Sequence, residues 1–117
     1  SAGLAAAFNA PMAGAMFETY VVTEIIKSYT AAGKDVRNRL CYYRDNNKKE
    51  IDLLIFENGK VHPIEIKKSA NPGKEALKNF EALDSMSAEV GAGAVICMTP
   101  IVIPIDRKNK LVPIGCI

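Results

Sequence analysis

The sequence predicts a single α/β (α+β) domain in which helices pack on one mixed central sheet. Three observations favour this class. Residues 10–32 carry apolar side chains at helical spacing. Asn58-Gly59 separates two β-rich runs, which is the strongest short-range signal of a hairpin. Residues 94–98 form a short, continuous apolar run that is typical of a buried strand. The whole chain of 117 residues is long enough for one core without disulfides or metals, so residues 1–117 are interpreted as one domain.

The first helix is expected over residues 10–32. Phe17, Val21 and Ile25 form one stripe, and apolar residues on other sides widen it, so we expect a helix buried nearly all round. Gly33 follows the last periodic residue and is a plausible C-terminal stop.

The remaining elements give the order helix, three strands, helix, strand, with a final edge strand. Prolines interrupt the chain before the last of them. The strands are expected at 39–44, 50–57, 60–67, 94–98 and 111–114, and the second helix at 74–86.

A two-residue Asn58-Gly59 loop fixes the register of the hairpin. Asp52 then falls opposite Glu65, and Glu50 opposite Lys67. Because alternate strand residues share a face, all four charged residues are expected on one side of the hairpin. The other side is expected to be apolar and to pack on a helix through Ile51, Leu53, Ile55, Ile64 and Ile66.

Asp52 facing Glu65 places two like charges side by side, which destabilises a hairpin unless something compensates. A divalent cation does so, since Mg²⁺ and Mn²⁺ prefer carboxylate and water oxygens. Lys67 on the same face can offset charge or orient a water or a phosphate. The alternative is that Glu50 and Lys67 form a surface ion pair and Asp52 is simply solvated.

The first helix offers two acids for a third position in this site, Glu18 and Glu24. Six residues separate them, so they point about 120° apart and cannot both face one small cluster. We choose Glu18, which follows small residues that let a strand approach closely. Glu24 has Lys27 within pairing distance on the helix.

Charge and cysteine content narrow the function classes. The net charge of +2 is too small to demand nucleic acid or membrane as a partner. No apolar stretch reaches the roughly 18 residues of a membrane span. Cys41 and Cys97 lie in apolar runs without metal-binding spacing, which predicts reduced core cysteines in a cytoplasmic protein.

The acidic and basic residues together resemble the PD-(D/E)XK nuclease superfamily. Asp52 matches its metal-binding aspartate, Glu65 and Lys67 its (D/E)-x-K, and Glu18 the acid of its first helix. Ile51 stands where the signature has proline. The resemblance implies an α-β-β-β-α-β core and Mg²⁺-dependent hydrolysis of phosphodiesters, with Asp52, Glu65 and Glu18 as metal ligands.

Five short motifs stand in order along the chain: Gly14-Ala-Met-Phe-Glu18, Tyr42-Tyr43-Arg44-Asp45, Glu50-Ile-Asp-Leu-Leu54, Pro63-Ile-Glu-Ile-Lys67-Lys-Ser69 and Ala94-Val-Ile-Cys97. Together they give a closer resemblance, over about residues 10–117, to DUF4143, the C-terminal domain of a family of AAA-type ATPases. The resemblance implies that the chain is a C-terminal fragment of a longer ATPase, whose N-terminal ATPase domain is then a partner.

The expected function is therefore a nuclease-like domain that hydrolyses DNA with Mg²⁺ or Mn²⁺. Two alternatives stay open, and with them the question of whether the chain is an enzyme. The first is a non-catalytic module that binds DNA or protein and retains the nuclease fold. The second is a structural domain that assembles homo-oligomers of the ATPase.

Overall fold

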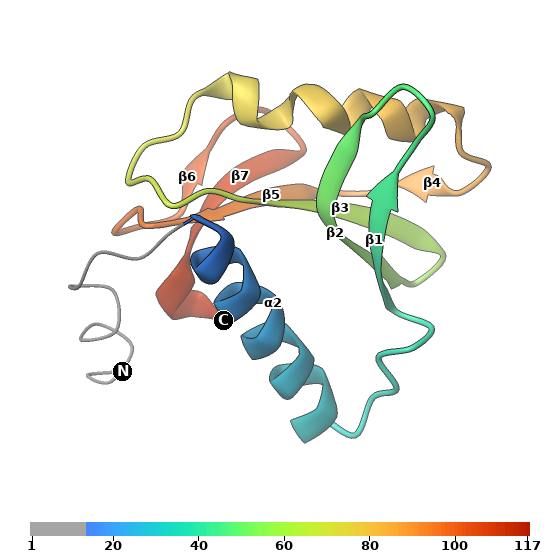
Figure 1. Ribbon diagram of the computed structural model, residues 1–117, viewed down its shortest axis with the longest axis horizontal. Helices are drawn as coiled ribbons and strands as arrows, with labels where there is room; N and C mark the ends of the chain where they lie inside the picture. Colours follow the sequence, from blue (N-terminus) through green and yellow to red (C-terminus); the bar gives the residue numbers. More distant parts are fainter. Residues whose placement is uncertain (1–13) are drawn as a thin grey trace.

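A computed structural model describes residues 14–117 and shows one mixed seven-stranded sheet with a helix on each face (Figure 1). The strands lie in the order β1-β2-β3-β5-β7-β6, and the short β4 pairs with β3 beyond this path. The predicted α+β class is confirmed. The elements are α2 (Gly14–Ala31), β1 (Leu40–Arg44), β2 (Glu50–Glu57), β3 (Lys60–Ile66), η1 (Lys74–Ser85), β4 (Glu89–Val90), β5 (Gly93–Cys97), β6 (Ile103–Pro104), β7 (Asn109–Pro113) and η2 (Ile114–Cys116).

The helix α2 packs on the sheet along a single stripe. Phe17, Val21 and Ile25 are buried, as the spacing predicts. Met16 is 61% exposed, so the expectation of a helix buried all round is wrong: the sheet covers only one side of it. Gly33 has a φ of +75° and ends the helix as predicted. The predicted start at residues 10–13 lies outside the described residues.

The β2–β3 hairpin has the predicted turn and register. Asn58 and Gly59 have φ values of 53° and 76°, the left-handed values that a type I′ turn requires. The ladder runs from the pair Glu57 and Lys60 to the pair Leu53 and Ile64, as a two-residue loop dictates.

A bulge in β2 changes the predicted faces at its start. Between β1 and β2, Cys41 pairs with Leu54 and Tyr43 with Ile51, so β2 uses three steps where β1 uses two. The extra residue turns Ile51 to the side of Leu54, and the expectation that it packs with Leu53 is wrong. Asp52 lies within this bulge.

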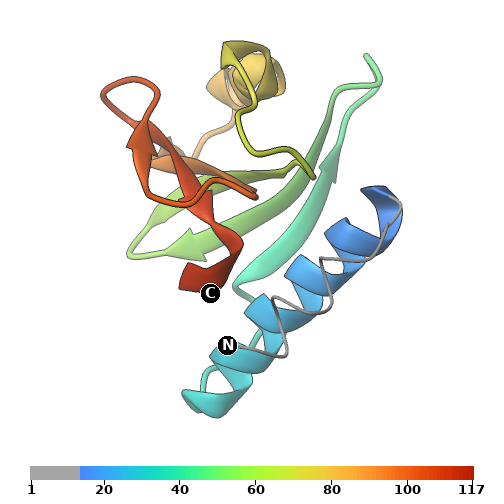
Figure 2. The same cartoon turned by 90° about the vertical axis from the view of Figure 1, so that its left-hand side faces the viewer.

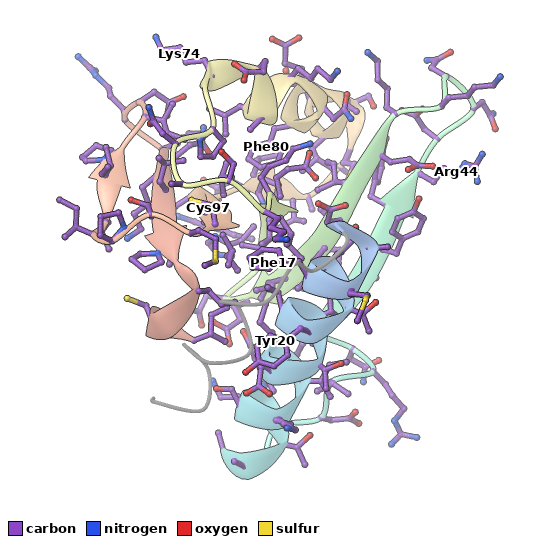
Figure 3. The ribbon with its side chains drawn as sticks, turned by 60° about the vertical axis from the view of Figure 1, so that its left-hand side comes forward. Phe17, Tyr20, Arg44, Lys74, Phe80 and Cys97 are labelled. Carbon is purple, nitrogen blue, oxygen red and sulfur yellow. The ribbon has the colours of Figure 1, made fainter. Side chains whose placement is uncertain are left out.

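The helices α2 and η1 lie on opposite faces of the sheet (Figure 2). Each face carries a separate part of the core. Figure 3 shows Phe17 of α2 and Phe80 of η1 on these opposite sides. The α2 side buries Phe17, Val21, Ile25, Leu53, Ile64, Ile66, Ile96 and Ile114. The η1 side buries Ile51, Leu54, Val61, Phe80 and Leu83, and beside them Ala76, Val95, Cys97 and Leu111.

Other differences from the predicted elements lie toward the C-terminus. The second helix is a 3₁₀ helix. The strand predicted at 111–114 is not the edge, because the two residues of β6 pair outside it. Cys97 is buried as predicted, whereas Cys41 is exposed because β1 is an edge strand. None of the helices in the described part of the chain is both long and apolar enough to span a membrane.

Candidate functional site

Asp52 is held in the bulge by a hydrogen bond to the neighbouring strand. Its Oδ2 accepts the backbone N–H of Ile66 at 2.8 Å. The regular β2–β3 ladder ends at Leu53 and Ile64, so a side-chain oxygen takes the place of the next main-chain acceptor. This contact fixes the carboxylate between the two strands. Regular alternation of side chains along a strand does not predict this hydrogen bond.

Glu65 is a buried carboxyl group beside Asp52. Glu65 is only 7% exposed. Burial, followed by a hydrogen bond to Asp52 and the charge of Asp52, raises the pKa of Glu65 to about 8, against an opposing effect from Lys67. At neutral pH Glu65 therefore keeps its proton beside Asp52, which relieves the repulsion that the sequence predicts.

Glu18 approaches the same pair from α2. Burial raises the pKa of Glu18, and the charge and a hydrogen bond of Asp52 raise it further. Glu24 instead forms an ion pair with Lys27 at 3.1 Å on the outer part of the helix. The structure thus brings Glu18, and not Glu24, to Asp52.

Lys67 is the cation next to the carboxyl groups. It is exposed at the end of β3, and its charge opposes the rise in the pKa of both Glu65 and Glu18. Glu50 forms its ion pair with Arg44 at 3.5 Å, across the β1–β2 pair and not across the hairpin. The alternative in which Glu50 pairs with Lys67 is therefore wrong. The regular pairing of β2 with β3 stops at Leu53 and Ile64, so Glu50 and Lys67 do not face each other across the hairpin.

Carboxylate oxygens are suitable ligands for Mg²⁺ or Mn²⁺. The proton that Glu65 keeps beside Asp52 marks a place where a cation would serve the same purpose, so the donor set fits such an ion. Within residues 14–117, no three His, Cys, Asp or Glu side chains form a ready-made metal site. A cation held by this pair would complete its shell with water or with oxygens of a substrate.

Fold and site together define an α+β domain in which a buried glutamate contacts a half-buried aspartate, with a third acid and a lysine nearby, at the point where the regular pairing of β2 with β3 ends. The chain belongs to the family DUF4143, described as a domain of unknown function, whose model matches residues 13–117. The predicted family is confirmed. No curated protein and no solved structure matches the chain.

Proposed function

We propose that this domain is a nuclease-like module that hydrolyses DNA phosphodiesters at Asp52, Glu65 and Lys67. The observation that carries the proposal is the contact between the buried Glu65 and the half-buried Asp52 beside an exposed lysine. A structural ion pair has no need of two acids in contact, and such perturbed groups are typical of functional sites.

The arrangement of elements supports a PD-(D/E)XK-like core. The chain runs α2, β1, β2, β3, η1 and β5, with only the two-residue β4 between η1 and β5. Apart from β4, this is the α-β-β-β-α-β order of that superfamily. The acids come from the first helix and from two adjacent strands, and Lys67 follows Glu65 by two residues. The bulge in β2 is itself a common feature next to active sites, where it re-aims a side chain.

Each residue has a definite part in the proposed reaction. A bound Mg²⁺ or Mn²⁺ would polarise the scissile phosphate and lower the pKa of the attacking water. A water oxygen forms the new bond to phosphorus, the bond to the leaving sugar oxygen breaks, and one proton passes from the water through solvent to that leaving oxygen. Lys67 positions the water and balances the charge that develops on the phosphate. Asp52 and Glu65 would hold the cation, and Glu18 would orient Asp52 from α2.

The family resemblance extends the proposal to the surrounding protein. We propose that the domain acts with an N-terminal AAA-type ATPase domain of the same protein in the cytoplasm. The three free thiols at Cys41, Cys97 and Cys116 are consistent with a reducing compartment.

The second candidate is a binding module for DNA or protein that retains the fold without catalysis. The exposed Lys67 beside the carboxyl groups could serve binding as well as catalysis. A variant of this candidate is a domain that assembles the ATPase into oligomers.

A cleavage assay separates these candidates. Wild-type protein is incubated with linear and branched DNA in the presence of Mg²⁺ or Mn²⁺, alongside Asp52→Asn and the exposed control Glu89→Gln. The proposal expects cleavage by wild type and Glu89→Gln, and at least a hundredfold loss in Asp52→Asn. Intact DNA with wild-type protein, or equal cleavage by Asp52→Asn, would refute hydrolysis at this site.

A further inference from the structure

A hollow of about 260 Å³ lies between the end of β3 and the start of η1. It begins at Lys67, the same lysine whose charge acts on Glu65 and Glu18, so Lys67 links the hollow to the candidate site. Its other lining residues are Ser69, Pro72, Glu75, Ala76 and Lys78.

Three lining side chains can donate hydrogen bonds to an anion. Lys67 and Lys78 are exposed ammonium groups that come from β3's end and from η1. The Ser69 Oγ accepts the backbone N–H of Asn71 at 3.3 Å, which leaves its own proton to donate into the hollow.

Glu75 is the one acid on the wall. Its Oε1 accepts the backbone N–H of Gly73 at 3.2 Å, so the carboxylate is tied to the chain just before η1. An anion in the hollow would meet this charge as well as the two lysines. Removing the charge of Glu75 should therefore strengthen anion binding, while removing that of Lys78 should weaken it.

The size of the hollow limits the ligand. Pockets for drug-sized molecules start at about 300 Å³. A volume of about 260 Å³ suits a smaller group, such as a phosphate with part of its sugar. Lysine ammonium groups bind phosphate as point charges, without the planar geometry that arginine imposes.

We propose that this hollow binds a phosphate of a nucleic-acid strand, adjacent to the phosphate that lies at Asp52 and Glu65. The inference rests on the proposed function and adds a second contact point along the substrate. Lys67 stands between the two phosphates and Lys78 holds the outer one, so the strand runs from the carboxylate pair toward η1.

Fluorescence anisotropy of a labelled single-stranded DNA oligonucleotide in EDTA tests the proposal without hydrolysis. The proteins are wild type, Lys78→Ala, Glu75→Gln and the control Lys60→Ala, whose exposed lysine lies at the hairpin turn, the far end of β3 from Glu65. Lys78→Ala should bind more weakly, and its slope of log affinity against log salt should fall by about 0.7, the value for one phosphate on a single strand. Glu75→Gln should bind more tightly, and Lys60→Ala should match wild type. Equal affinity and slope for Lys78→Ala and wild type would overturn the subsite.

A competition arm distinguishes a strand from free phosphate. Inorganic phosphate should displace the oligonucleotide only at concentrations far above the affinity for DNA. Wild-type protein that binds inorganic phosphate but no oligonucleotide would overturn the proposal. The cleavage assay is read separately from the binding assay. If Asp52→Asn loses cleavage but Lys78→Ala binds DNA like wild type, the subsite is refuted and the nuclease proposal stands. If Asp52→Asn cleaves like wild type but Lys78→Ala binds DNA more weakly, the nuclease proposal is refuted and the subsite stands.

Discussion

Replacing Glu65 by glutamine tests the electrostatics of the carboxylate pair. The side chain keeps its shape and burial, but it no longer takes up or releases a proton. In the native protein the pKa of Glu65 is about 8, against 4.5 for an ordinary glutamate, mainly because the group is buried and lies against Asp52. The substitution removes this difference between the folded and unfolded states.

The sign of the effect follows from proton linkage. Between pH 4.5 and about pH 8 the folded wild type holds a proton on Glu65 that the unfolded chain has released. The free energy of unfolding of the metal-free wild type should therefore fall as pH rises through this window, by up to about 1.4 kcal/mol per pH unit from this group. In Glu65→Gln this part of the slope should vanish. The free energy of unfolding of the variant, relative to that of wild type, should therefore increase as the pH approaches 8.

Urea unfolding in EDTA at pH 5, 6, 7 and 8 measures these slopes. The control is Glu89→Gln, which removes an exposed glutamate at the start of β4 and should keep the wild-type slope. Adding Mg²⁺ at pH 8 should raise the stability of wild type more than that of Glu65→Gln. Parallel stability profiles for wild type and Glu65→Gln would refute the assignment of Glu65 as a buried acid that keeps its proton at neutral pH.

Three further substitutions test other parts of the structure. Gly59→Ala should cost about 1–2 kcal/mol of unfolding free energy, because its φ of +76° strains any residue with a Cβ and no neighbour lies within 4 Å. The control is Gly115→Ala, which also has open space around it. Equal losses in the two variants would contradict the type I′ turn. Ile51→Ala should cost roughly 2–5 kcal/mol in urea unfolding, whereas Ile26→Ala, at 39% exposure, should stay within about 0.5 kcal/mol. A small loss for Ile51→Ala would contradict the burial of Ile51 on the η1 side of the sheet. Glu18→Gln should abolish metal-dependent cleavage and leave the circular dichroism spectrum unchanged. Glu24→Gln should lose only its ion pair with Lys27. Cleavage that is lost in Glu24→Gln and kept in Glu18→Gln would reverse the choice between the two acids.

The sequence was informative wherever the pattern was local and regular. The Asn58-Gly59 turn predicted the hairpin register correctly, because only a few turn types join two strands through two residues. The stripe of Phe17, Val21 and Ile25 predicted the buried face of α2 for a similar reason.

The errors arose where the chain departs from regular geometry. The bulge inserts one residue into β2, which reverses the side of Ile51 and brings Asp52 to the N–H of Ile66; strict alternation cannot foresee either change. The over-estimated burial of α2 has a different cause. Composition says that Met16 is apolar, but only the arrangement of the sheet says that nothing in the described chain covers it.

The candidate site was predictable in part for the same reasons. Charge repulsion between Asp52 and Glu65 follows from the register. The structure also brings Glu18 to Asp52 and places Lys67 near both glutamates. The hollow beside Lys67 was not predictable, because Ser69 and Lys78 come from separate elements and share no spacing that marks them as neighbours.

The central claim is that Asp52 and Glu65 form a binding site for a divalent cation. Isothermal titration calorimetry with Mn²⁺ on wild type and on Asp52→Ala, at pH 7.5 and without DNA, tests it most directly. One Mn²⁺ should bind per wild-type chain, with release of a proton that makes the heat depend on the buffer, and Asp52→Ala should lose at least tenfold in affinity. Equal Mn²⁺ affinity in the two proteins would contradict the claim.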